Sequence, residues 1–378
     1  MGKNVYASVK SYSQRGKLLK RADYQTLAES RDLEELMTRI KNTIYADAVS
    51  DVQKPYTSQG IESGLRGHLA DVHYSIAKTA GDSPILDAYY MKFIVSNLKL
   101  ILKGKVLGKS QEEIETHINL HAEELIKQRD IIIKALVSKD LEEAVTSLNS
   151  VQFGEEISKA ASLYNEQKNL QIFDTYFDKI LYLQLGRALK NNRDRDVIKL
   201  VGMDVDFYNL LSVIRGKLWG LDEAQIQDLI VTQTATITKE LLGRMMSAAS
   251  VRDAFNELTN TKYKNLISQN ENELDAVAEF ERSFEMALYN ASARSFSKMF
   301  SFATIVGITK LTAFEVRNLA AIAYAIEQKI PTETTMSKLI LEALLAIENQ
   351  KLMDFPGANM VSKKNKSGMW LRVRSPLQ

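Results

Sequence analysis

The stretch that decides the fold is NLKLILKGKVLG, at residues 97–108. Related stretches follow at residues 209–220, NLLSVIRGKLWG, and at residues 318–329, NLAAIAYAIEQK. In each, apolar residues follow Asn-Leu at the spacing of one helix face, which predicts an amphipathic helix. The first two end in Gly-Lys-x-x-Gly, where glycine can adopt the left-handed conformation that ends a helix. The third has Ala325 and Ile326 instead, which predicts that its helix continues toward Pro331.

A second recurring block is Asp-Leu-Glu-Glu-Leu at residues 32–36. It returns at residues 140–144 and, in degraded form, at residues 250–254, so the copies lie 108 and 110 residues apart. An aromatic residue follows each copy at the same distance: Tyr45, Phe153 and Tyr263. Acidic residues favour the first turn of a helix, so each block predicts a helix start. We expect the cap to be the serine that precedes each block: Ser30, Ser138 and Ser247.

Between these two blocks lies a further predicted helix with an apolar residue at every fourth position. Its apolar positions are Ile61, Leu65 and Leu69, then Phe173, Phe177 and Leu181, then Phe280, Phe284 and Leu288. An acid follows the first apolar residue in every copy: Glu62, Asp174 and Glu281. The simplest interpretation of these acids is a solvated helix face.

Three blocks that recur in one order at nearly constant separations predict a triplicated chain. With only 5 prolines and 17 glycines, and long stretches of helix-compatible residues, the fold class is expected to be all-α. The predicted repeats of about 110 residues cover 1–118, 119–232 and 233–351. Residues 352–378 carry no acid after Asp354, and we expect a basic, flexible tail there.

Composition excludes several functional classes. The 378 residues include 49 basic and 47 acidic side chains, a net charge of +2, which argues against a nucleic-acid partner. The absence of cysteine excludes disulfides, thiol nucleophiles and cysteine-based zinc sites. No secretion signal is visible, and the longest relevant uncharged apolar run, Met299–Thr309, is far too short to span a bilayer.

Local motifs give no catalytic or cofactor site. The glycines of Gly104-Lys105-x-x-Gly108 have one residue too few between them for a phosphate loop, and the same pattern recurs as a predicted helix stop. His117 and His121 would share a helix face, but two ligands are too few for a metal, so we expect solvent-facing histidines. We therefore predict no catalytic residue, no cofactor and no metal.

The asparagines that open the three stretches are unusual, because asparagine is a poor residue for the middle of a helix. They are Asn97, Asn209 and Asn318. One interpretation is a buried hydrogen bond that closes a loop, and the other is a contact with a partner protein.

These motifs together resemble the C subunit of the archaeal A-type and bacterial V/A-type rotary ATPases, whose eukaryotic relative is the d subunit of the vacuolar ATPase. The resemblance covers residues 4 to about 350. Besides the recurring blocks, it rests on Asn4–Val9, on Asn42–Tyr45, and on Tyr90–Phe93 followed by Asn97–Lys99. The third repeat, which lacks the glycines, and the basic tail depart from the pattern.

The resemblance implies a funnel of three helical repeats around a pseudo-three-fold axis, without catalytic activity. It also implies a position on the cytoplasmic face of a membrane, peripheral through the complex. The chain would link the central shaft, made of the D and F subunits, to the membrane rotor ring and transmit torque for proton or sodium transport. The alternative is a free-standing helical repeat adaptor that binds an amphipathic helix of a partner. The ion, the direction of operation and the contact residues stay open.

Overall fold

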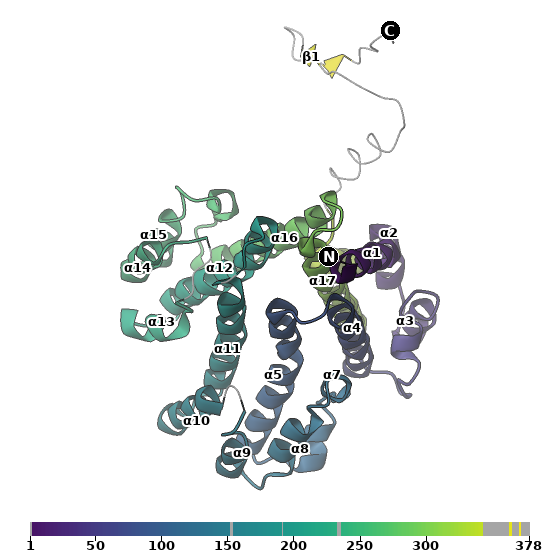
Figure 1. Ribbon diagram of the computed structural model, residues 1–378, viewed down its shortest axis with the longest axis horizontal. Coiled ribbons are helices and arrows are strands. Elements are labelled where there is room, and N and C mark those ends of the chain that lie inside the picture. The colour runs from purple at the N-terminus through teal and green to yellow at the C-terminus, as the bar shows by residue number, and fades with distance from the viewer. Residues whose placement is uncertain are drawn as a thin grey trace. The chain divides into compact units, whose positions relative to one another are not determined.

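The computed structural model describes residues 2–151, 154–190, 192–232, 236–342, 363–364 and 370–371. The chain divides into two units, Met1–Ile340 and Leu341–Gln378. The described part of the first unit is built from helices, which confirms the expected all-α class (Figure 1). In the second unit, β1 (Lys363–Lys364) pairs antiparallel with β2 (Trp370–Leu371). The rest of the predicted basic tail, 352–378, lies outside the described residues.

The helices fall into three consecutive segments with the same element order, apart from α10, which only the second segment has among the described residues. The first segment is α2 (Arg21–Ala28), α3 (Leu33–Ile40), α4 (Ser58–Ala80), α5 (Pro84–Val106) and α6 (Gln111–Glu115). The second is α8 (Arg129–Val137), α9 (Leu141–Ser147), α10 (Gly154–Gln167), α11 (Gln171–Lys190), α12 (Arg195–Leu218) and α13 (Glu223–Leu229). The third is α14 (Lys239–Ser247), α15 (Val251–Asn256), α16 (Glu273–Arg294), α17 (Phe302–Glu327) and α18 (Thr332–Lys338).

Five further elements complete the described part of the first unit. α1 (Gly2–Lys17) precedes the first segment and α7 (His121–Leu125) follows it. Three single turns of 3-10 helix are η1 (Asp47–Val49), η2 (Lys264–Leu266) and η3 (Ser295–Ser297).

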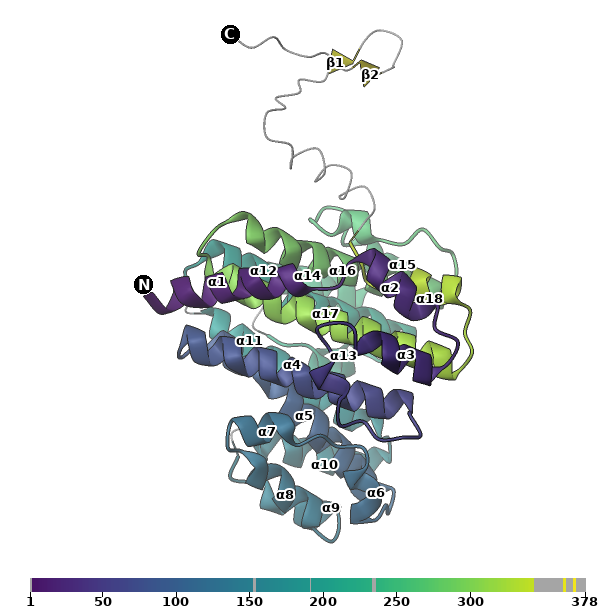
Figure 2. The ribbon, with the colours of Figure 1, turned by 90° about the vertical axis from the view of Figure 1, so that its right-hand side faces the viewer.

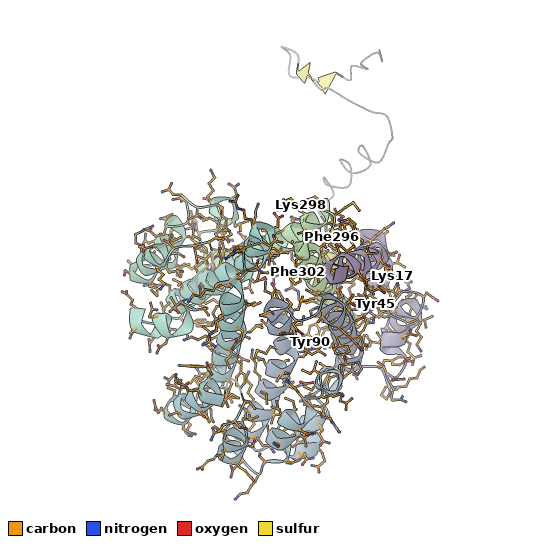
Figure 3. All side chains as sticks on the ribbon, viewed as in Figure 1. Lys17, Tyr45, Tyr90, Phe296, Lys298 and Phe302 are labelled. Carbon is orange, nitrogen blue, oxygen red and sulfur yellow. The ribbon has the colours of Figure 1, made fainter. Side chains whose placement is uncertain are left out.

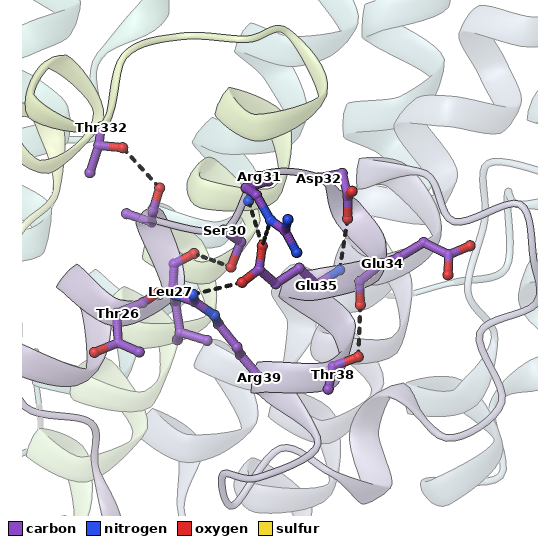
Figure 4. A network of polar contacts seen from close by, with 11 residues as sticks. Thr26, Leu27, Ser30, Arg31, Asp32, Glu34, Glu35, Thr38, Arg39 and Thr332 are labelled. Carbon is purple, nitrogen blue, oxygen red and sulfur yellow. Dashed lines mark hydrogen bonds and ion pairs between the residues drawn. The ribbon is translucent and has the colours of Figure 1, made fainter.

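The predicted helix starts are correct, but their caps are not the predicted serines. The side chains of Asp32, Asp140 and Ser250 cap α3, α9 and α15, each accepting a hydrogen bond from the third helical amide. Figure 4 shows this bond at α3, from the Glu35 amide to Asp32 Oδ1 at 2.8 Å. An N-cap must directly precede the helix with extended backbone, and the serines lie two or more residues too early. The Ser30 hydroxyl instead donates to the carbonyl of Leu27.

The ends of the three long helices α5, α12 and α17 correspond position by position. Gly108 and Gly220 have φ of 67° and 70°, as the predicted helix stops require. The expectation that the third helix continues toward Pro331 is wrong, because α17 ends at Glu327. Lys329 takes the glycine's place with φ of 55°, and the amide of Ile330 donates to the carbonyl of Ala325 at 2.8 Å. Lys329 thus adopts the left-handed conformation that favours glycine, and the hydrogen bond that closes the helix is the same as at the ends of α5 and α12.

The first glycine of each Gly-Lys-x-x-Gly has a packing role. A Cβ on Gly104 would lie 2.6 Å from Cγ1 of Ile114, and one on Gly216 would lie 2.6 Å from Cγ1 of Ile226. Both distances are too short for a real contact, so these glycines let α6 and α13 pack closely on the long helices.

Long helices from different segments pack against one another. α5 packs on α11, α12 on α16, and α17 on α4, so each of the three segments contacts both others. α1 lies beside α4 and α17, as both views show (Figures 1 and 2). The apolar positions predicted on α4, α11 and α16 are buried in these contacts, apart from the partly buried Leu181.

Candidate functional site

The asparagine of each long helix binds the backbone of a residue 22 positions later. Asn209 Nδ2 donates to the Val231 carbonyl at 3.0 Å, and the Val231 amide donates to Asn209 Oδ1 at 2.8 Å. Asn318 makes the same two bonds with Ile340, at 2.8 and 3.0 Å. One side-chain amide thus satisfies one buried backbone amide and carbonyl, which would otherwise lack partners. The bonds tie the chain beyond α13 and α18 back to the long helix.

Asn97 makes this pair of bonds with Asn119, at 2.7 and 3.3 Å, and adds a third. Its Nδ2 also donates to Glu123 Oε1 at 2.8 Å. Burial raises the pKa of Glu123, while the bond from Asn97 acts in the opposite direction. The first segment therefore carries an acid at this position in addition to the backbone bonds.

A buried acid three residues before the asparagine joins segments two and three, and segments three and one. These acids lie outside the motifs that the sequence alone brought forward. Asp206 on α12 accepts hydrogen bonds from the hydroxyl of Tyr263 at 2.6 Å and from the amide of Thr236 at 3.2 Å. Tyr263 is the aromatic residue of the recurring block in the third segment, so this bond crosses between segments.

Glu315 on α17 has the corresponding role toward the first segment. Its carboxylate accepts from the hydroxyl of Tyr45 at 2.7 Å, from the amide of Leu19 at 2.8 Å, and from the hydroxyl of Tyr24 at 3.2 Å. Figure 3 labels Tyr45 on the side where α2, α3 and α4 lie. Burial raises the pKa of Glu315 to about 7, although the hydrogen bond from Tyr45 acts against this shift.

The corresponding position on α5 is apolar. Ile94 is buried in a hydrophobic cluster, and the aromatic residue of the second segment's block is Phe153, which lacks a hydroxyl. Phe153 lies outside the described residues. The sequence thus pairs an acid with tyrosine at two positions and isoleucine with phenylalanine at the third.

The acids predicted on a solvated helix face form ion pairs with a neighbouring segment in two cases out of three. Asp174 on α11 pairs with Lys103 on α5, and Glu281 on α16 pairs with Arg215 on α12 at 2.6 Å. Lys103 and Arg215 both lie six residues after the asparagine. On α17 this position is Tyr324, a residue that is 55% exposed. Glu62, the third acid, therefore has no cation at this position of α17, and it lies 3.7 Å from Arg66 on its own helix.

The three long helices meet at a single buried polar cluster. Lys310 of α17 forms an ion pair with Asp204 of α12, and the hydroxyl of Tyr89 on α5 donates to the same carboxylate. The Lys310 ammonium also lies 5.7 Å from the centre of the Tyr89 ring. A buried ion pair is stable only with good geometry and further hydrogen bonds, and this cluster supplies both. One side chain from each segment therefore contributes to it.

A cavity of about 350 Å³ lies among α4, α5, α11 and α17. Its lining includes the cations Arg66, Lys92, Lys99 and Arg317 and the acids Glu62 and Asp178. Burial, together with the positive charges of Arg66 and Lys310, lowers the pKa of Lys92 to about 7.

The two motifs considered for chemistry have structural surroundings. Lys105, from the glycine motif, donates to the carbonyl of Leu136 at 2.6 Å, at the end of α8. The expectation that His117 and His121 share a helix face is wrong, because α6 ends at Glu115 and α7 begins at His121. His121 Nε2 lies 2.7 Å from Asp71 Oδ1.

Within the described ranges, no cluster of three or more metal-ligating side chains occurs. Among those same residues, none of the helices combines the length and the apolar character needed to cross a membrane.

Comparison with known proteins identifies a family and several relatives that this chain resembles. The profile of the ATP synthase (C/AC39) subunit family matches residues 7–338. A relative named as the C subunit of the A-type ATP synthase in Methanocaldococcus jannaschii is 24% identical over 349 residues, which cover 89% of this chain and 86% of the relative. A protein of the same name in Methanothermobacter thermautotrophicus is 27% identical, covering 84% of this chain and 83% of the relative. The one in Pyrococcus horikoshii is 22% identical, with coverage of 87% and 88%.

The fold and the profile together define an accessory, non-catalytic component of a rotary ATPase. The chain belongs to the ATP synthase (C/AC39) subunit family, as the resemblance in the recurring blocks predicted.

Proposed function

We propose that this chain is the central-stalk socket of an A-type or V-type rotary ATPase. It would accept the central shaft, made of the D and F subunits, and rest on the membrane rotor ring at the cytoplasmic face. Its task would be to transmit torque between ATP hydrolysis or synthesis and proton or sodium transport. The names of the relatives support membership of the complex, and the linking role is our inference.

The observation that carries the proposal is the cyclic order of helix packing. The long helices pair as α5 with α11, α12 with α16, and α17 with α4, so the last segment returns to the first. This order supports three repeats, 1–118, 119–232 and 233–351, arranged as a funnel around a pseudo-three-fold axis. A closed ring of helices resists twisting better than an open array, because every segment is held on two sides.

We further propose that Asn97, Asn209 and Asn318 serve the socket as internal clasps and not as partner contacts. All three are buried, and each binds the backbone 22 residues later. A side chain whose donor and acceptor are already used inside the chain has little left to offer a partner. The clasps would fix the short helices that follow the long ones.

The test is reconstitution of the rotary complex with and without this chain. We expect ATP hydrolysis by the catalytic head to continue without it, while ion transport into vesicles is lost. Adding the chain back should restore transport. Normal ion pumping by the head and ring alone would refute the proposal. Copurification tests the adaptor alternative, because an adaptor would not bring down the membrane ring.

A further inference from the structure

The cavity among α4, α5, α11 and α17 has walls from all three segments and an excess of positive charge. Four cationic side chains and two acidic ones line it, together with apolar side chains such as Leu69, Leu181 and Val316. Its volume of about 350 Å³ suits one or two side chains of a partner rather than a folded domain.

Two of the four cations are closely paired with acids. Lys99 pairs with Asp178 on α11 at 2.5 Å. Arg317 pairs through both terminal nitrogens with the Glu285 carboxylate, one of the contacts being 2.8 Å. Such paired charges have little attraction left for another anion, so the remaining two cations decide what the cavity can bind.

Lys92 and Arg66 are the two cations that remain. Lys92 forms no ion pair within the described part of the chain, and its ammonium lies 5.0 Å from the centre of the Phe93 ring. Arg66 donates to the hydroxyl of Ser96 at 2.6 Å, while its carboxylate neighbour Glu62 lies farther away, at 3.7 Å. Arg66 is on α4, and its partner Ser96 follows Lys92 by four residues on α5. Both cations therefore lie against the same side of α5, about one turn apart.

An ammonium without an anion partner is unfavourable in such a place. The lowered pKa of Lys92 has this cause, since burial and the neighbouring cations oppose its charge. A carboxylate placed between Lys92 and Arg66 would remove the penalty and form charge-assisted hydrogen bonds.

We propose that Lys92 and Arg66 form a binding site for an acidic side chain of the shaft partner, which enters the cavity with apolar neighbours beside it. The inference rests on the proposed function, because it specifies the chemistry of the partner that the socket accepts. An amphipathic helix with a carboxylate among its apolar residues meets both requirements.

The test compares full-length variants in binding to the purified complex of the D and F subunits. Lys92→Met keeps the length of the side chain and removes its charge. We expect the dissociation constant to rise about tenfold or more, while the Tm of the free chain stays unchanged or rises. Lys92→Arg restores the charge and should bind nearly as well as the wild type. Lys103→Met is the matched control, because Lys103 is on the same helix but does not line the cavity.

Each alternative result has a distinct meaning. Equal binding of the wild type and Lys92→Met, or equal loss in Lys92→Met and Lys92→Arg, would overturn the inference and leave the proposed function standing. If the wild type does not bind the D and F subunits at all, the proposed function itself fails. Inorganic phosphate is the probe for a free-anion site. If phosphate raises the Tm of the wild type alone and shaft binding is equal, the acidic-partner inference is wrong.

Discussion

The contact between the third and first segments and the contact between the first and second segments are held together by different interactions. Between the third and first segments, the buried carboxylate of Glu315 accepts hydrogen bonds from Tyr45 and Tyr24. The residue six positions after the asparagine is the exposed Tyr324, which cannot form an ion pair. Between the first and second segments, the residue three positions before the asparagine is the buried Ile94, and the residue six positions after it is Lys103, which forms an ion pair with Asp174.

The contact between the second and third segments has both kinds of interaction, the buried hydrogen bond from Tyr263 to Asp206 and the partly exposed ion pair between Arg215 and Glu281. The same arrangement of helices is therefore compatible with either kind of polar interaction. A buried hydrogen bond and an exposed ion pair differ greatly in their contribution to the free energy of unfolding, because water competes for the exposed pair. The three contacts should accordingly respond differently to mutation, pH and salt.

The largest expected effect is at Glu315. Glu315→Ile copies the apolar residue of α5 and leaves the buried hydroxyls of Tyr45 and Tyr24 and the amide of Leu19 without their acceptor. We expect the free energy of unfolding to fall by about 3–5 kcal/mol. Urea unfolding followed by circular dichroism measures the loss.

The matched control is the double variant Glu315→Ile with Tyr45→Phe, which copies the residues that the sequence has at the corresponding positions, Ile94 and Phe153. Because one orphaned hydroxyl is then absent, the double variant should be more stable than the sum of the two single losses predicts. Additive losses would show that Tyr45 and Glu315 do not act together.

The second expected effect is a pH dependence that the Glu315 contact confers. Its pKa is about 7 in the folded chain and about 4.5 when unfolded, so the folded state binds more protons between these values. The contribution of Glu315 to the free energy of unfolding is then full at low pH and falls by about 3 kcal/mol as pH rises from 4.5 to 7. The measurement is a series of urea unfolding curves across that range.

Glu315→Gln serves as the comparison, because an amide cannot titrate. The difference in stability between the wild type and Glu315→Gln should change steadily with pH over this range. A constant difference would contradict the raised pKa.

The smallest expected effect is at the partly exposed ion pair between Lys103 and Asp174. Lys103→Met should change the free energy of unfolding by less than about 1 kcal/mol, because Lys103 and Asp174 are both partly exposed to water. At about 1 M salt, screening should abolish the difference from the wild type. A loss as large as that of Glu315→Ile would mean that exposed charge, and not buried hydrogen bonding, dominates these contacts.

Much of the fold could be predicted from the sequence, because helical periodicity and the stops at Gly108 and Gly220 are local signals. Lys329 was missed, since the closing bond of α17 imposes a conformation that lysine rarely adopts alone. The Asp32 cap was missed because aspartate and the earlier serine are both acceptable caps, and only the backbone at the helix start decides between them.

The bonds between segments could not be predicted from any one repeat. Tyr45 and Glu315 are 270 positions apart, and their contact depends on which segment packs against which. A signal was nevertheless present. Acids precede Asn209 and Asn318 where the following segment supplies tyrosine, whereas an isoleucine precedes Asn97 where the next segment supplies phenylalanine. Comparing the differences among the repeats, and not only their similarities, would have indicated these pairs.

The cluster of Tyr89, Asp204 and Lys310 has a mechanical consequence. Because one carboxylate serves side chains from the two other long helices, sideways displacement of α12 lengthens both contacts at once, and displacement of α5 or α17 lengthens one of them. A twisting load applied to one segment is therefore shared with both others at this point. Asp204 is thus the one side chain of this cluster that bonds to both other helices, and a sequence that lost it would lose the polar link among all three.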